Sequence, residues 1–177
     1  LDIDVIKAKE EGRPSSDEEN AMALAKAMEI IDGLGLEKAV VASSGNGAYV
    51  MAKVFFDKDL DTVNAKMKAL EKKIEAQFFP EGCGLKLDPM QKLVGLHAAM
   101  GTLKMKGTAD AEHPYRIARV MGEVPTEICQ VTQRLIEEME VNTATQILTP
   151  LNSVAVSAVN PGQELCRGLI RVHQLAL

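Results

Sequence analysis

Residues 1–19 read LDIDVIKAKEEGRPSSDEE, and the first five of them decide where the sheet of this fold begins. Apolar residues alternate there with Asp2 and Asp4. An alternation with a period of two predicts a β-strand whose two acids share one face. Like charges at this spacing repel unless water or a cation separates them. The stretch is therefore either an ordinary solvated strand face or half of a metal site.

A helix is predicted after this opening stretch, over residues 17–34. Ser16 can cap its first turn, and Glu19 three residues later completes a capping box. Apolar residues at helical spacing predict one face that packs on a flat surface. That face consists of Leu24, Met28 and Ile31.

Two strand-like runs follow, KAVVAS at 38–43 and AYVMAKV at 48–54, and the turn Ser44-Gly45-Asn46-Gly47 joins them. Asn-Gly is a strong hairpin signal because both residues tolerate positive φ. We therefore expect an antiparallel hairpin, followed by a helix over 60–79 that Asp59 caps. The apolar face of that helix consists of Val63, Met67, Leu70 and Ile74.

The remaining signals are shorter. GCGLKLDP at 82–89 predicts a strand that places Asp88 on the face opposite its leucines. Residues 92–98 are a further candidate strand. A third helix is predicted from about Pro125, because the proline ring suits a first helical turn. Its apolar stripe consists of Ile128, Val131, Leu135 and Met139.

These elements lack the regular rhythm of a parallel βαβ sheet, which favours an α+β fold with an antiparallel sheet backed by helices on one face. The other face of the sheet can then present polar residues. A chain of 177 residues suits one domain with a sizeable core. We expect residues 1–140 to form that core, and residues 141–177 to be a C-terminal extension of unknown role that packs on it.

Composition narrows the class of protein. Hydrophobic residues make up 46% of the chain and charged residues 25%, the usage of a soluble globular protein. The net charge of −5 excludes a chain coated in basic residues but leaves room for a local basic stripe. Cys83, Cys129 and Cys166 are too far apart for a disulfide framework, and no stretch is apolar enough to span a membrane. We therefore expect a cytoplasmic protein without a membrane partner.

Asp2, Asp4 and Asp88 are the candidate metal ligands. By strand parity all three carboxylates can face the same side of the sheet, and Mg²⁺ or Mn²⁺ prefers carboxylate oxygen. Two such ions would suit in-line phosphoryl or nucleotidyl transfer. The alternative role for Asp88 is to cap a turn before Pro89. The histidines lack the spacing of a zinc site; they are His97, His113 and His173.

Candidate phosphate ligands gather around the hairpin turn. SSGNG bares backbone N–H groups that can form an anion-binding nest, although the turn alone also explains Asn-Gly. On the next strand, Tyr49 and Lys53 share the face expected to carry the acids. Later segments supply basic residues suited to a triphosphate or a nucleic-acid backbone, although for any one of them solvated surface is the simpler explanation. These are Lys104, Lys106, Arg116 and Arg119.

The order of these motifs resembles a known family. LDIDV with GRPSSDEE, then VVASSGNGAYV, then LKLDP, GTLKMKG and HPYRIARV together resemble the archaeo-eukaryotic primase superfamily. The likeness is to the primase-polymerase-like domains of phages, plasmids and other mobile elements, and it covers roughly residues 1–120. It implies an RRM-like antiparallel sheet of the primase-polymerase core type, and template-dependent joining of nucleotides by two-metal catalysis.

The resemblance also implies a site. The catalytic, metal-binding acids of the family match Asp2, Asp4 and Asp88, which would bind Mg²⁺ or Mn²⁺. Its nucleotide-binding motifs match Ser44, Gly45, Asn46, Gly47, Tyr49, Gly101, Thr102, Lys104, Lys106 and Arg116. The implied partners are nucleoside triphosphates, a single-stranded DNA template, and a helicase or other replication protein.

Two departures from the family pattern keep other functions open. The family has histidine where this chain has Tyr49, and a phenol is neutral near pH 7. Family members also usually carry an N-terminal αβ unit before the first acidic strand, so we expect this chain to be truncated, excised from a larger protein, or degenerate. The second interpretation is a catalytically inactive nucleotide- or nucleic-acid-binding module of a replication assembly. The third is a metal-dependent replication initiator or nuclease, although such enzymes commonly use paired histidines.

Overall fold

A computed structural model describes residues 1–88 and 99–139 of the chain. Its strands are β1 (Asp2–Val5), β2 (Ala39–Ser43), β3 (Gly47–Ala52), β4 (Leu85–Asp88), β5 (Leu103–Lys104), β6 (Arg116–Ile117) and β7 (Arg119–Val120). Its helices are α1 (Ile6–Glu11), α2 (Asp17–Leu34), α3 (Leu60–Phe78) and α4 (Gln130–Glu137).

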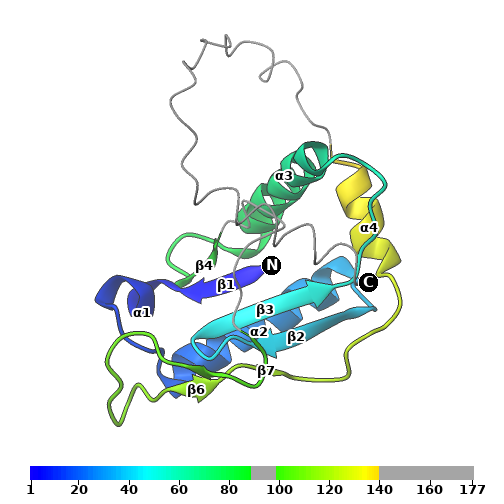
Figure 1. The fold of residues 1–177 in the computed structure, drawn as a ribbon. Coiled ribbons are helices and arrows are strands. Elements are labelled where there is room, and N and C mark those ends of the chain that lie inside the picture. The colour runs from blue at the N-terminus through cyan, green and yellow to red at the C-terminus, as the bar shows by residue number, and fades with distance from the viewer. Residues whose placement is uncertain (89–98, 140–177) are drawn as a thin grey trace, which may run out of the picture. The chain divides into compact units, whose positions relative to one another are not determined.

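Five of the strands form one antiparallel sheet in the order β4-β1-β3-β2-β7 (Figure 1). The opening strand β1 therefore lies between β4 and β3, and the predicted hairpin of β2 and β3 is confirmed. Strands β5 and β6 pair as a separate two-stranded ribbon. The α+β class and the antiparallel sheet with helices are thus confirmed.

One face of this sheet forms the hydrophobic core. Ile3 on β1 lies opposite Ala48 on β3 and Leu87 on β4, and all three side chains are buried. Helix α2 covers this face behind β2 and β3 (Figure 1), and α3 adds Leu70 and Ile74 to the same cluster. Burial of each large aliphatic side chain contributes about 1.5 to 3 kcal/mol. Because side chains alternate along a strand, the residues next to Ile3 point to the opposite face.

Helix α2 has the predicted bounds, and its capping box is confirmed. The Glu19 backbone N–H donates to Ser16 Oγ at 3.2 Å, and the Ser16 N–H donates to the Glu19 carboxylate at 2.8 Å. The predicted apolar face is wrong at Met28, whose side chain is 51% exposed. The buried residues of α2 are Ala23, Ala27 and Ile30. Alanine side chains are short, so this face lets the helix approach the sheet more closely than methionine would.

Of the other two predicted helices, one starts where predicted and the other does not. Helix α3 follows the predicted cap, since Asp59 accepts a hydrogen bond from the Thr62 N–H at 2.9 Å. Helix α4 begins at Gln130 rather than near Pro125, because the chain before it pairs with residue 53. The Cys129 N–H donates to the Lys53 carbonyl at 2.9 Å, and Lys53 Nζ donates to the Thr126 carbonyl at 2.9 Å. Lys53 is therefore engaged there and does not accompany the acids.

Four short elements were not predicted, namely α1, β5, β6 and β7. The candidate strand at 92–98 lies outside the described residues. The chain divides into two units, Leu1–Val141 and Asn142–Leu177, and the role expected for the C-terminal extension falls on residues that the structure does not describe. Within residues 1–88 and 99–139, no helix is both long and apolar enough to cross a bilayer.

Candidate functional site

The structure brings the three predicted acids to one face of the sheet. Asp2 on β1 lies directly opposite Asp88 on β4, and directly opposite Tyr49 on β3. Residues that face each other across antiparallel strands point to the same side, and so do residues two apart on one strand. The carboxylates of Asp2, Asp4 and Asp88 therefore share the face that lies away from the core. We call these three residues the acidic face.

The carboxylates are close enough to affect one another. Burial, together with the negative charges of Asp4 and Asp88, raises the pKa of Asp2 from its ordinary value of 3.8 to about 6. The positive charge of Lys104 acts in the opposite direction on the same pKa. At pH 7 Asp2 is mostly ionised, so the acidic face carries three negative charges that need a cation nearby.

Lys9 supplies that cation in the structure. Its ammonium donates to Asp4 Oδ2 at 2.6 Å and to Asp88 Oδ1 at 2.9 Å. These hydrogen bonds raise the pKa of Lys9 above its ordinary value, so the ammonium stays charged. The short helix α1 starts immediately after β1 and returns the chain toward the acids, which places Lys9 there. No pattern in the sequence predicted a role for Lys9.

The donor set of the acidic face suits a divalent cation. Carboxylate oxygens are the preferred ligands of Mg²⁺ and Mn²⁺, and two of the three carboxylates already share one positive charge. Within residues 1–88 and 99–139, no group of three acidic, histidine or cysteine side chains is arranged to hold a metal ion directly. The Lys9 ammonium lies between the oxygens of Asp4 and Asp88. A metal ion would have to take its place.

The hairpin turn lies next to the two-stranded ribbon of β5 and β6. Gly45 has a φ of +92°, and a Cβ built on it would lie 2.7 Å from Lys104 Cβ and 2.9 Å from the Arg116 carbonyl oxygen. A Cβ at Gly47 would collide with the carbonyl of Ile3 on β1. The turn therefore needs both glycines, and it brings together three of the predicted nucleotide-binding residues.

The backbone of the turn is less open than predicted. The Ser44 N–H donates to the Gly47 carbonyl at 3.0 Å, and the Gly45 N–H donates to Ser43 Oγ at 3.2 Å. Two of the N–H groups expected to be bare are therefore already bonded. The Asn46 side chain accepts from the Ser15 N–H at 3.4 Å through Oδ1. Its Nδ2 is buried and has no hydrogen-bond partner within the described part of the chain.

The two basic residues of the ribbon lie opposite each other, since Lys104 on β5 pairs with Arg116 on β6. The Arg116 guanidinium donates to Asp17 Oδ1 at 2.6 Å and to the Ser15 carbonyl at 2.7 Å. It therefore ties the ribbon to the start of α2. Lys104 is half-buried and near enough to Asp2 to affect its pKa. The third basic residue, Lys106, lies exposed on the loop that follows.

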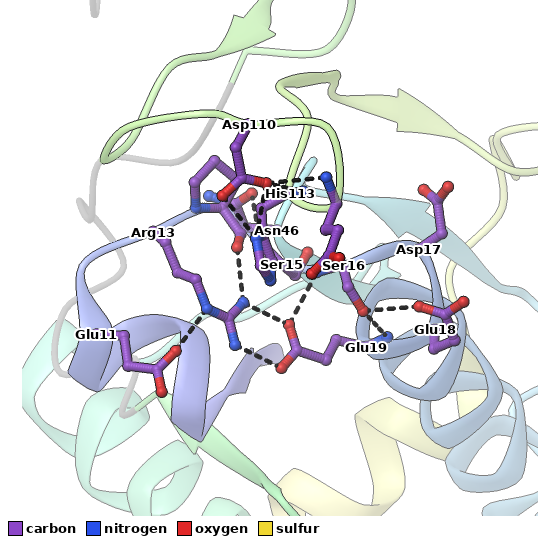
Figure 2. A network of polar contacts seen from close by, with 12 residues as sticks. Glu11, Arg13, Ser15, Ser16, Asp17, Glu18, Glu19, Asn46, Asp110 and His113 are labelled. Carbon is purple, nitrogen blue, oxygen red and sulfur yellow. Dashed lines mark hydrogen bonds and ion pairs between the residues drawn. The ribbon is translucent and has the colours of Figure 1, made fainter.

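Figure 2 shows how the segment between α1 and α2 is fixed beside this turn. Arg13 binds Glu19 through two hydrogen bonds, of 2.7 and 2.9 Å, and Glu11 through one of 2.6 Å. Arg13 lowers the pKa of Glu19 to about 2. His113, at the other side of the cluster, pairs with Asp110 at 2.9 Å. The GRPSS segment of the sequence therefore acts as a bonded connector that holds the turn in place.

Tyr49 occupies the middle of the acidic side of the sheet. Its side chain is only 7% exposed, and it lies in register with Asp2. Gly101 and Thr102, the other predicted residues of this region, exchange backbone hydrogen bonds of 2.7 and 2.9 Å with Ala118. They fix the start of the ribbon.

Comparison of this chain with protein-family models, with curated proteins and with solved structures finds no match.

Proposed function

We propose that this chain is the core of a primase-polymerase-type nucleotidyltransferase that joins nucleotides on a single-stranded DNA template. One observation supports this most: segments far apart in the sequence meet as an acidic face beside a glycine turn and a basic ribbon. Asp2 lies opposite Asp88, a Cβ at Gly45 would collide with Lys104 and the Arg116 carbonyl, and Lys104 acts on the pKa of Asp2. Nucleotidyl transfer needs this combination of metal-binding acids and phosphate-binding cations.

In this proposal the acidic face holds Mg²⁺ or Mn²⁺. Bound there, the metal would activate the 3′-hydroxyl of the growing strand and neutralise charge that develops on the phosphates. We assign Lys104 to the triphosphate, because its Cβ lies close to Gly45 of the turn and its charge acts on the pKa of Asp2. Arg116 is already bonded to Asp17 and Ser15, so we assign it the task of holding the turn in shape. The unpaired Asn46 Nδ2 is a donor that a phosphate oxygen could satisfy.

Primer extension on a single-stranded template, with Mg²⁺ or Mn²⁺ and nucleoside triphosphates, tests this proposal. Asp4→Asn should reduce extension by about 100-fold or more. The amide would no longer bind the metal ion that stabilises the charge of the transition state. Asp32→Asn is the matched control, because Asp32 is exposed at the end of α2 and the chemical change is identical. Extension that is equal in the two variants would exclude the acidic face as the catalytic site.

A second function is favoured by one residue. Tyr49 is neutral near pH 7 where the family places a histidine, so it cannot give an imidazolium charge to a phosphate. The alternative is therefore an inactive relative that binds nucleotide or nucleic acid within a replication assembly, with a helicase or another replication protein as partner. Triphosphate binding by titration, without any primer extension by the wild-type chain, would support this alternative.

A further inference from the structure

Lys9 binds the acidic face, and the proposed function does not use it. Its ammonium lies between the carboxylates of Asp4 and Asp88, at 2.6 and 2.9 Å. The lysine side chain is 32% exposed, and those of Asp4 and Asp88 are 23% and 46% exposed. The ion pair is therefore formed at a place that solvent ions can reach.

The position of the ammonium conflicts with that of a metal ion. Asp4 on β1 and Asp88 on β4 are diagonal neighbours, since Asp88 pairs with Asp2, and Asp4 Oδ2 and Asp88 Oδ1 both bind Lys9 Nζ. A Mg²⁺ ion binds carboxylate oxygen at about 2.0 to 2.1 Å. It cannot share the space between these two oxygens with an ammonium group. Metal and Lys9 therefore compete.

We propose that Lys9 is an internal counter-ion of the acidic face, which holds Asp4 and Asp88 together in the metal-free protein and which a divalent cation must displace in order to bind. This inference rests on the metal site of the proposed function. Lys9 is a positioning residue here. If it served only to hold the acids in place for the metal, its removal would weaken metal binding; as a competing cation, its removal tightens metal binding.

Titration of Mn²⁺, followed by the paramagnetic resonance signal of the unbound ion, tests the direction of this effect. Lys9→Met should bind Mn²⁺ about tenfold more tightly than wild type, a change that corresponds to about 1.4 kcal/mol. Lys7→Met is the matched control, since Lys7 lies exposed on the same helix and its loss changes the net charge equally. It should bind Mn²⁺ within about twofold of wild type. Equal or weaker binding by Lys9→Met overturns the proposal.

A second measurement uses the wild-type protein and does not depend on how the variant folds. Acylation of lysine amines, mapped by mass spectrometry, should be slow at Lys9 without metal and several-fold faster once Mg²⁺ saturates the protein. Labelling of Lys7 should not change. Unchanged labelling of Lys9 while Mg²⁺ is shown to bind overturns the proposal for Lys9 and leaves the metal site standing. Absence of Mn²⁺ binding by wild type and both variants overturns the metal site itself, and with it the proposed function.

Discussion

At the scale of single residues, folding changes the protonation of Asp2. Its pKa is raised to about 6 in the folded protein, from an ordinary value of 3.8. The folded state therefore binds a proton more tightly than the unfolded state, so Asp2 makes the protein less stable as the pH rises from about 4 to about 6. Above that window the full destabilisation is present.

The direction of this pH dependence of stability gives a test of the acidic face that needs no metal. Asp2→Asn should remove the loss of stability between pH 4 and 6, and at pH 7 the variant should be more stable than wild type by about 1 to 2 kcal/mol. That figure is below the roughly 3 kcal/mol for two pKa units, because Asp2 is partly open to solvent. Urea unfolding at several pH values, in the presence of a chelator, measures the difference. If the free energy of unfolding depended on pH identically in the two proteins, the pKa of Asp2 would not be raised by burial and the other acids.

Tyr49 gives a second prediction at this scale. In Tyr49→His an imidazole would stand beside Asp2, whose negative charge favours the protonated ring. A charge-assisted hydrogen bond to phosphate is worth about 1.5 to 3 kcal/mol, so triphosphate affinity should rise about tenfold or more. Tyr49→Phe, which keeps the ring and loses the hydroxyl, is the control. If Tyr49 is only a strand residue packed on its neighbours, isothermal titration will show no gain for histidine.

The sequence predicted which face of the sheet the acids share, but it did not predict that Lys9 binds them. The shared face of Asp2 and Asp4 follows from the geometry of one strand, and Asp88 needs only the same argument on a second strand. Lys9 reaches Asp88 across 79 positions of sequence. That contact depends on α1 turning the chain back after β1, which no local pattern in IKAKEE indicated to us.

At the scale of elements, local signals explain which predictions held. The start of α2 was predictable because Ser16 and Glu19 bind each other within one turn. The buried face of α2 was not, because the close packing of Ala23 and Ala27 on the sheet is a tertiary effect and large apolar residues dominate a periodicity argument. Strands of two residues, such as β5 and β6, have no pattern of their own and exist through their partners.

A substitution in the hairpin turn tests how the turn packs against the ribbon of β5 and β6. Gly45→Ala should destabilise the protein more than Gly82→Ala does, by about 1 to 3 kcal/mol. Both glycines have positive φ, +92° and +79°, so both substitutions carry the same backbone strain. Only at Gly45 would the new methyl group meet Lys104 and the Arg116 backbone, since nothing lies within 4 Å of a Cβ at Gly82. Chemical denaturation of both variants measures the difference.

The same pair of variants carries a functional expectation. Displacement of the ribbon should move Lys104 away from Asp2, so Gly45→Ala should lose triphosphate affinity while Gly82→Ala retains it. Equal loss of stability in the two variants would mean that the turn and the ribbon do not pack as described. Equal triphosphate affinity, with the extra loss of stability present, would remove Lys104 and the turn from the nucleotide site.

At the scale of the whole described unit, the fold brings segments that are far apart in the sequence next to one another. The order β4-β1-β3 places Asp88 and Tyr49 on either side of Asp2. The Arg116 ion pair with Asp17 then joins the ribbon to the start of α2 across 99 positions. The class of fold was predictable from the sequence because it depends on local patterns. The strand order was not, because it depends on pairing between distant strands. The resemblance to the primase superfamily rests on the order of motifs along the chain, and the nucleotide site that it implies stays a prediction.

The last prediction concerns the stability of the whole unit. A ligand that binds only the folded state stabilises it by mass action, about 2.7 kcal/mol at a hundred times its dissociation constant. If the acidic face binds a divalent cation, Mg²⁺ or Mn²⁺ should raise the thermal unfolding midpoint of wild type by several degrees, and a nucleoside triphosphate should add to the shift. The shift should be smaller than for Lys9→Met at equal metal concentration, because wild type first gives up its internal ion pair.

Two controls make this measurement specific to the acidic face. Asp4→Asn should lose the metal-dependent shift, since the strand that carries Asp2 then has one charged ligand fewer. Asp32→Asn should keep the shift, because Asp32 is exposed on α2 and belongs to no part of the site. A general effect of ionic strength would move both variants alike, and a matched concentration of NaCl measures it directly. An unchanged wild-type midpoint with either metal, even with a nucleoside triphosphate present, would remove support for both the active and the inactive form of the proposal.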